Sequence, residues 1–493
     1  MAAKKPSALE AELKDADYMT ILSGGGTSKV FEKNSLVDYC YPTGISVIDY
    51  ALGYRVNVRD SSGKIIKQRV CLGLQAGSIN VLTGPTQSFK TTLGIQMTAN
   101  IAYAHDGNII HIDAENRLSL QRAKTLTRLP ESWFTGKYPR YTIKNGAIGY
   151  DTLQNYVTEI YERKMAARTL LLKDTGEVDD QNQPIWLMPP TVLFLDSISD
   201  VIAKEYDMRD RKEWDKQKEM RSNTDGMQNA KTLKGVLSDV LPMMKEANII
   251  MLTIAHENAN VAMTAFAGPK KQFQYGNKDV KVSGGRSLEY NTSALMTFTA
   301  EIKEDSRYHV DSDGFEGNTV LFEPTKVSTN ESGNAKTGLG FRIVIDKRLN
   351  GADNVRTLVK FLEDRGRIKG DRRGYKVISP TGEEMSDKFS WKNIYEDLKN
   401  NPVAYKTFML TAKEELEKLL ADAPDVAGTI DVFNLDKICS GFDTASYTDP
   451  TNTINTDPTI TTKTTEAGSC GIGNKRMAIN IDYLDYLEKS FVA

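Results

Sequence analysis

The chain has 493 residues, of which 40% are hydrophobic and 26% are charged, so it is long enough to bury one large core and a smaller domain. Its 63 basic and 65 acidic residues leave a formal net charge of -2, which excludes an argument for nucleic-acid binding from total charge. No apolar stretch approaches the roughly 20 residues of a membrane span, and the four cysteines form no CxxC pair, so we expect a soluble, cytoplasmic protein with no membrane partner, zinc site or disulfide framework.

The first elements expected along the chain are a helix and a hairpin. Residues 7–22 have the pattern of a short helix within an N-terminal element that spans residues 1–36. Apolar residues alternate between Tyr54 and Val70 around the turn-forming run Asp60-Ser61-Ser62-Gly63. This alternation predicts a β-hairpin ahead of the next motif.

That next motif is an apolar strand that runs into a glycine-started loop, followed by Lys-Thr at the head of a predicted helix. In such a loop the backbone N–H groups cradle nucleotide phosphates, the lysine reaches the terminal phosphates and the hydroxyl binds Mg²⁺. Phe89 stands where the pattern asks for a second glycine, so an ordinary strand, turn and helix with a solvent-facing lysine is the alternative. The candidate nucleotide-binding residues are Gly84, Pro85, Thr86, Gln87, Ser88, Phe89, Lys90, Thr91 and Thr92.

Three further apolar runs each end in polar residues. Asn108–Ile112 leads into Asp113-Ala114-Glu115, Thr191–Leu195 into Asp196-Ser197, and Asn248–Ile254 into Ala255-His256. Runs that are apolar on both faces, separated by helical segments, favour a parallel sheet between helices, and such sheets bind ligands at the carboxyl ends of their strands. For any one of these residues a solvated strand end is the alternative.

With this order of P-loop and polar strand ends, the chain resembles the RecA-type recombinases, and most closely their phage UvsX branch. The segments that carry the likeness are residues 42–53 (PTGISVIDYALG), Ser88-Phe89-Lys90, Asp113-Ala114-Glu115, residues 227–234 with the strand to His256, and Ser283-Gly284-Gly285-Arg286. The resemblance covers about residues 37–363, with a fainter similarity to about residue 415. It implies an α/β fold, namely a RecA-type P-loop ATPase core with a mostly parallel central sheet, an N-terminal assembly helix and a small C-terminal domain.

The resemblance gives roles to the residues at the nucleotide. Glu115 would be the general base that activates the attacking water, and Lys90 would contact the phosphates. Asp196 would hold Mg²⁺ through water, beside the Thr91 hydroxyl, and His256 would sense the γ-phosphate. Ala255 replaces the asparagine usual in the family, so half of that sensor pair is missing.

Two further nucleotide contacts follow from the same likeness. Phe341–Ile345 and the basic residues after it resemble the segment that a neighbouring subunit donates to ATP, which makes Lys347 and Arg348 the candidates for cations acting in trans. A strand ending in a solvated basic turn is the alternative. The adenine-stacking aromatic of the family falls near Arg122, so stacking would need a guanidinium face.

Two segments match the DNA loops of the family by position, at about residues 204–225 and 257–286. The second interleaves basic and aromatic residues, a composition typical of sequence-tolerant binding to single strands. For the first segment the alternative is a charged helix with ion pairs. For the second it is an ordinary flexible surface loop. The candidate DNA-binding residues are Phe266, Lys270, Lys271, Phe273, Tyr275, Lys278, Lys281, Arg286, Arg209 and Arg211.

The remaining organisation follows from shifts in composition. Residues 37–363 form the expected core, with a polar, glycine-rich insertion at about 301–340, and residues 364–443 form a small domain whose helical pattern runs from Trp391 to Leu420. Residues 444–475 are expected to be a disordered linker, and 476–493 an amphipathic segment.

The function implied is that of an ATP-dependent DNA strand-exchange recombinase. It would use ATP and Mg²⁺, form helical filaments of its own subunits on single-stranded DNA, pair that strand with homologous double-stranded DNA, and meet a single-strand-binding protein or a loading mediator. A ring helicase of the same ATPase class and a non-hydrolysing ATP-binding scaffold are the alternatives.

Overall fold

The computed structural model describes residues 39–146, 148–201, 223–259, 280–283, 286–301, 309–310, 315–328 and 338–420, all of which belong to one compact unit. The predictions for residues 1–36, 444–475 and 476–493 lie outside these ranges.

A large mixed sheet forms the centre of the fold, with strands in the order β17-β16-β15-β13-β5-β11-β10-β6-β7. The strands from β13 to β7 are parallel to one another, whereas β15, β16 and β17 continue the sheet in antiparallel pairs. The predicted mostly parallel α/β sheet is therefore confirmed. The bounds are β5 (Ile79–Gly84), β6 (Asn108–Asp113), β7 (Tyr141–Asn145), β10 (Thr191–Asp196), β11 (Ile249–Ala259), β13 (Ala294–Ala300), β15 (Glu316–Val327), β16 (Phe341–Asp346) and β17 (Gly351–Ala352).

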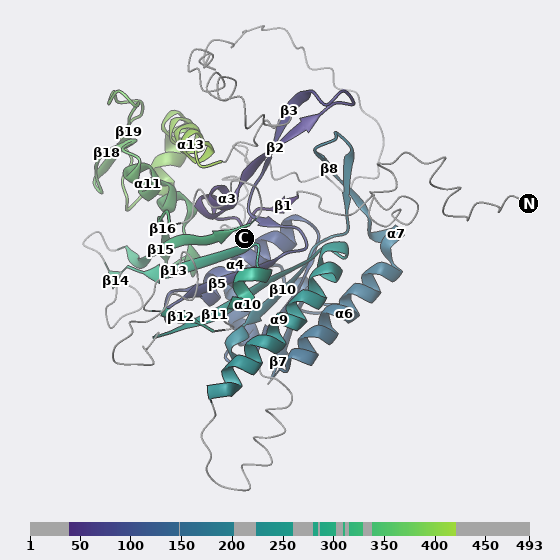
Figure 1. Ribbon diagram of the computed structural model, residues 1–493. Helices are drawn as coiled ribbons and strands as arrows, with labels where there is room; N and C mark the ends of the chain where they lie inside the picture. The colour runs from purple at the N-terminus through teal and green to yellow at the C-terminus, as the bar shows by residue number, and fades with distance from the viewer. Residues whose placement is uncertain are drawn as a thin grey trace, which may run out of the picture. The chain divides into compact units, whose positions relative to one another are not determined.

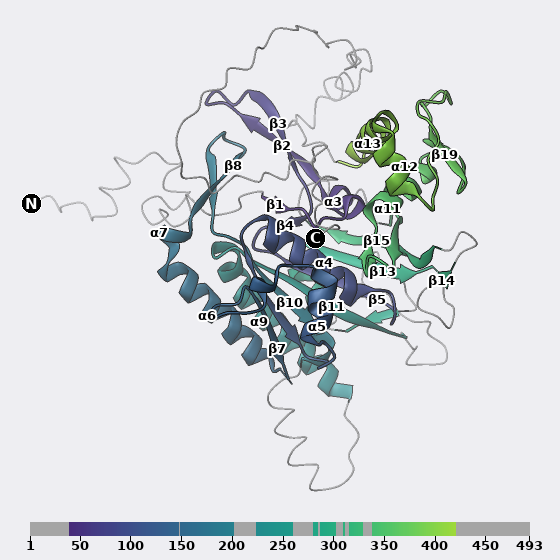
Figure 2. The ribbon, with the colours of Figure 1, turned by 180° about the vertical axis from the view of Figure 1, so that it is seen from behind.

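Helices cover both faces of this sheet. The helices α6 (Tyr150–Ala166) and α9 (Asn223–Glu246) lie on the face turned to the viewer in Figure 1, and α4 (Lys90–Ala104) and α5 (Leu120–Thr127) lie on the opposite face, seen in Figure 2. Every residue of β5 and of β10 is buried, which is why these strands are apolar on both faces. On the α4 side, a Cβ at Gly94 would lie 2.6 Å from the Phe194 ring, so glycine permits the close approach of helix and sheet.

Smaller sheets and helices surround the centre. The predicted hairpin is confirmed as β2 (Tyr54–Arg59) paired with β3 (Ile65–Cys71), and a second hairpin joins β8 (Lys173–Val178) to β9 (Pro184–Leu187). The other short elements are β1 (Cys40–Tyr41), α3 (Ser46–Leu52), β4 (Leu74–Gln75), η2 (Glu131–Trp133), α7 (Arg168–Leu171), η3 (Ile198–Asp200), β12 (Val280–Val282), α10 (Arg286–Asn291) and β14 (His309–Val310).

The structure corrects two boundaries expected from the sequence. The strand that reaches Ile254 does not end there, because β11 continues to Ala259 and its last residues pair with β12, from Glu257 with Val282 to Ala259 with Val280. The polar segment 301–340 is not merely an insertion, because β15 lies within it and pairs with β13 and β16 in the main sheet. Its buried positions alternate with half-buried ones, which lowers its apolar content.

The chain after the sheet forms a C-terminal module, residues 365–420, that follows α11 (Asn354–Asp364). It contains a hairpin of β18 (Ile368–Asp371) and β19 (Gly374–Val377) and two helices, α12 (Ile394–Asn400) and α13 (Pro402–Glu417). The predicted helical pattern from Trp391 to Leu420 is confirmed by these helices. The module is anchored by buried aromatic residues, among them Phe389, Trp391 and Phe408.

Candidate functional site

The loop between β5 and α4 adopts a strained backbone that brings it close to the sheet. Gly84 has φ +138°, and a Cβ there would lie only 2.0 Å from the carbonyl oxygen of Phe298. Phe89 has φ 62° and ψ 14°, the left-handed conformation that glycine adopts most readily. The position where the P-loop pattern asks for glycine therefore keeps the backbone of a glycine, while its phenylalanine side chain is buried.

Lys90 begins α4 and returns its side chain to this loop. Its Nζ donates to the carbonyl oxygens of Gly84 at 2.8 Å and Pro85 at 2.6 Å, and to the Ser88 hydroxyl at 3.2 Å. Burial lowers the pKa of Lys90 to about 8, against the opposing effect of nearby carboxylates, of which Glu257 is the largest. A buried ammonium over a loop at a helix N-terminus is an arrangement suited to phosphate.

Thr91 and Asp196 meet across the end of the sheet. The Thr91 hydroxyl donates to Asp196 Oδ2 at 2.8 Å. Burial raises the pKa of Asp196 to about 6, and the neighbouring carboxylates Glu115 and Asp113 add to this rise. A hydroxyl beside a carboxylate fits Mg²⁺, which takes one or two protein oxygens and completes its shell with water and phosphate.

Glu115 and His256 form the next contact on the same edge. His256 Nε2 lies 2.7 Å from Glu115 Oε1, and Arg117 NH1 lies 3.0 Å from Glu115 Oε2. The backbone N–H of Ala114 donates to the Asp196 carbonyl at 2.8 Å, which ties the segment after β6 to the end of β10. The strand register places Asp196 opposite Asp113 and His256 opposite Gly84. The structure thus brings Lys90, Thr91, Asp196, Glu115 and His256 together at one edge.

Two residues at this edge are not among those predicted from the sequence. Glu257 Oε1 accepts a hydrogen bond of 2.6 Å from the Thr83 hydroxyl, and the Ser199 hydroxyl accepts one of 2.9 Å from the His256 N–H. Glu257 is the first residue of the segment predicted as the second DNA loop, at about residues 257–286, but the structure places it on β11. The sequence pattern does not predict this strand position, because the apolar run ends three residues earlier, at Ile254.

A cavity of about 370 Å³ lies beside α4 and α5. Arg122 lines it together with Thr92 of α4, so the structure brings the predicted base-contacting residue to the predicted nucleotide-binding segment. Polar side chains predominate in the rest of the lining, which consists of Ser119, Gln121, Thr125, Leu126 and Asn350. Of these, Gln121 and Asn350 offer amide groups that can recognise the edge of a nucleobase.

The two predicted trans-acting cations follow β16. Lys347 pairs with Glu316 at the start of β15. Arg348 contacts Asp346, with NH2 2.9 Å from Oδ2, and this contact raises the pKa of Arg348. Both side chains are exposed, so the structure leaves their proposed action on a neighbouring subunit as a prediction.

The predicted DNA-binding residues fall largely outside the described part of the chain. Lys281 is exposed on β12, and Arg286 is the first residue of α10. The others lie outside the described residues: Phe266, Lys270, Lys271, Phe273, Tyr275, Lys278, Arg209 and Arg211. Their role in DNA binding therefore stays a prediction.

Within the described ranges no cluster of three or more His, Cys, Asp or Glu side chains is placed to hold a metal ion. None of the helices in the described part of the chain is both long and apolar enough to cross a membrane. Comparison of the sequence with protein-family models and with curated proteins finds no match.

Proposed function

We propose that this chain is an ATP-dependent, RecA-type DNA strand-exchange recombinase that assembles as a helical filament on single-stranded DNA. One observation carries the proposal. The P-loop lysine, a hydroxyl paired with a carboxylate, and a carboxylate paired with a histidine meet at the carboxyl edge of a mostly parallel sheet. That set matches the parts needed to hold and hydrolyse a nucleoside triphosphate.

In this proposal each residue of the set has a role in ATP binding or hydrolysis that suits its chemistry. Lys90 and the loop N–H groups bind the phosphates, and Thr91 and Asp196 hold Mg²⁺, which neutralises charge on the phosphates when bound. Glu115 orients the attacking water and accepts its proton, because a carboxylate near the terminal phosphate is a suitable general base. The contact with His256 Nε2 fixes the Glu115 carboxylate in position.

Strand β11 links the proposed nucleotide site to the proposed DNA loop. This strand carries His256 and Glu257 at the nucleotide edge and then continues into the pair with β12. The chain between these strands holds the basic and aromatic residues expected for single-strand binding. A change at His256 is therefore transmitted along one strand to the base of the proposed DNA loop.

The Glu115→Gln variant tests the hydrolytic part of the proposal. Glutamine keeps the size of the side chain and can still contact His256, but it cannot accept a proton. We expect ATP binding and ATP-dependent filament assembly to persist while turnover falls by about 10²–10⁴-fold. Arg117→Gln is the matched control, because it removes only the exposed partner of Glu115. Normal hydrolysis by Glu115→Gln would refute the assignment.

A further inference from the structure

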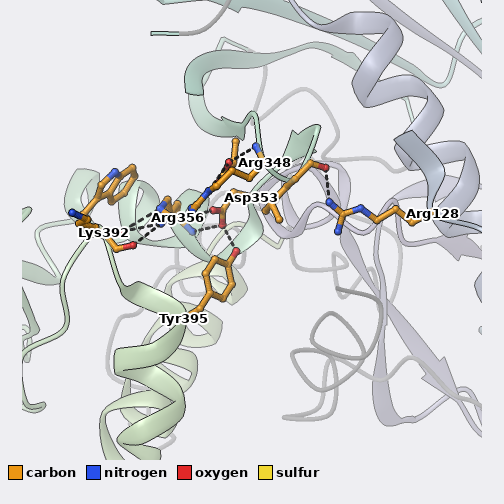
Figure 3. A network of polar contacts seen from close by, with 9 residues as sticks. Arg128, Arg348, Asp353, Arg356, Lys392 and Tyr395 are labelled. Atoms are coloured by element: carbon orange, nitrogen blue, oxygen red, sulfur yellow. Dashed lines mark hydrogen bonds and ion pairs between the residues drawn. The ribbon is translucent and has the colours of Figure 1, made fainter. Parts of the chain in front are cut away.

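A buried ionic network lies where β16, α11 and the C-terminal module meet (Figure 3). Its centre is Arg356 of α11, whose side chain is 1% exposed. Arg356 NH1 lies 2.6 Å from Asp353 Oδ2 and 3.2 Å from Asp346 Oδ2, and both carboxylates are fully buried. Two buried carboxylates are strongly unfavourable unless positive charges and hydrogen-bond donors compensate them.

The same guanidinium holds the C-terminal module. Arg356 NH2 donates to the carbonyl oxygens of Trp391 at 3.0 Å and Lys392 at 3.3 Å, and the Tyr395 hydroxyl donates to Asp353 Oδ1 at 2.7 Å. The planar fork of arginine serves these carbonyls and two carboxylates at once, which a lysine ammonium cannot do with the same geometry.

The second positive charge of the network is Arg348. Asp346 Oδ1 accepts the Arg348 backbone N–H at 2.7 Å, and Asp346 Oδ2 lies 2.9 Å from Arg348 NH2. The Arg348 side chain is 65% exposed, although its counter-charge is fully buried. Asp346 is therefore shared between an arginine inside the fold and one that faces outward.

The turn that carries Arg348 is attached to the nucleotide side of the molecule. Arg128, at the end of α5, donates to the Leu349 carbonyl at 2.9 Å, and Gln96 of α4 accepts the Ala352 N–H at 3.0 Å. Asn350 of this turn lines the cavity that also contains Arg122. The turn thus joins the cavity to the buried network.

We infer that Arg356 is a positioning residue that acts on Arg348 through Asp346, so that docking of the C-terminal module on α11 fixes where Arg348 presents its charge. The anion that Arg348 meets is the polyphosphate of a nucleotide bound between two copies of the chain. This part rests on the proposed function. Arg348 is better suited to the role than Lys347, because its counter-ion is held rigidly by Arg356, whereas Lys347 pairs with the partly exposed Glu316.

The test is a double-mutant cycle in the full chain with Arg356→Lys and Arg348→Ala, read in the kcat and KM of ATP hydrolysis on single-stranded DNA. We expect each single change to lower kcat about tenfold with KM for ATP nearly unchanged, because the Arg348 contact strengthens only in the transition state. The double variant should be no slower than Arg348→Ala alone. Arg342→Lys is the matched control and should keep normal turnover, because Arg342 lies on the same strand as Asp346 but makes a surface pair with Asp364 of α11.

Several results would overturn the inference. They are an unchanged kcat for Arg348→Ala, an unchanged kcat for Arg356→Lys beside a slow Arg348→Ala, and losses that multiply in the double variant. A wild-type chain without hydrolysis would instead contradict the proposed function. Melting temperatures of the wild type, the two single variants and the double variant then decide whether Arg356 and Arg348 are coupled through Asp346. A non-additive shift in the double variant supports the coupling, and additive shifts reject it.

Discussion

Asp196 is unfavourable for the fold at neutral pH, although the proposed function assigns its carboxylate a role in holding Mg²⁺. Its carboxyl is buried beside Asp113 and Glu115, and its pKa rises to about 6. Because the folded pKa lies above the unfolded value, the stability that comes from the bound proton is fully present below about pH 4 and is lost as the pH rises through about 6. At neutral pH the carboxylate therefore destabilises the folded chain.

The Asp196→Asn variant should consequently be more stable than the wild type at pH 8. We expect its free energy of unfolding to rise by roughly 1–3 kcal/mol at that pH, measured by denaturant titration, with no gain at pH 4. Mg²⁺-dependent ATP hydrolysis should be lost at the same time, because asparagine is a poor substitute for the carboxylate. A variant less stable than the wild type at pH 8 would show that the carboxylate is stabilised by its neighbours.

Phe89 combines a buried ring with an unfavourable backbone. Replacing it by glycine or alanine removes the same ring, but only alanine keeps the cost of a left-handed conformation. We expect Phe89→Gly to be more stable than Phe89→Ala by about 0.5–1 kcal/mol in denaturant unfolding.

Leu93 is also buried but lies within α4 with ordinary helical geometry, so it supplies the control for this pair. There the order should reverse, because glycine weakens a helix interior by about 1 kcal/mol relative to alanine. The same order at both positions would contradict the role given to the Phe89 backbone.

At the scale of elements, α5 places one polar face against the cavity. Arg122 lines the cavity, whereas Lys124 on the same helix pairs with Glu131 and does not. If the cavity holds the base of the nucleotide, Arg122→Ala removes binding that is equal in ground and transition states. We expect KM for ATP to rise about 3–10-fold with kcat little changed. Lys124→Ala should behave as the wild type. Equal effects of the two changes on KM would contradict the assignment of this cavity to the nucleotide base.

The elements also show which parts of the site a sequence can reveal. Strands β5 and β10 are predictable because both faces are buried. Asp196 then follows from its place at the end of β10, and Lys90 and Thr91 follow from their place at the head of the helix after the glycine-started loop. The extension of β11 and the position of β15 depend on partners distant in the chain. Glu257, for example, contacts Thr83, which is 174 residues away in the chain, so no local sequence pattern predicts the contact.

At the scale of the whole molecule, the mostly parallel sheet and its two helical layers could be predicted from the alternation of apolar runs and helical segments. The buried network around Arg356 could not, because its members come from β16, α11 and the C-terminal module and each resembles an ordinary surface charge in the sequence. Arg356 meets Trp391 across 35 residues and Asp346 across 10. Such networks become recognisable only when the fold brings their members together.

The most direct test of the central proposal is ATP hydrolysis with and without single-stranded DNA, with electron microscopy of the same mixtures in a slowly hydrolysed ATP analogue. The proposal predicts turnover stimulated by single-stranded DNA together with helical filaments, and loss of turnover in Lys90→Ala. Rings in place of filaments would indicate a helicase. Assembly that is independent of DNA and shows no turnover would contradict the recombinase and indicate an ATP-binding scaffold.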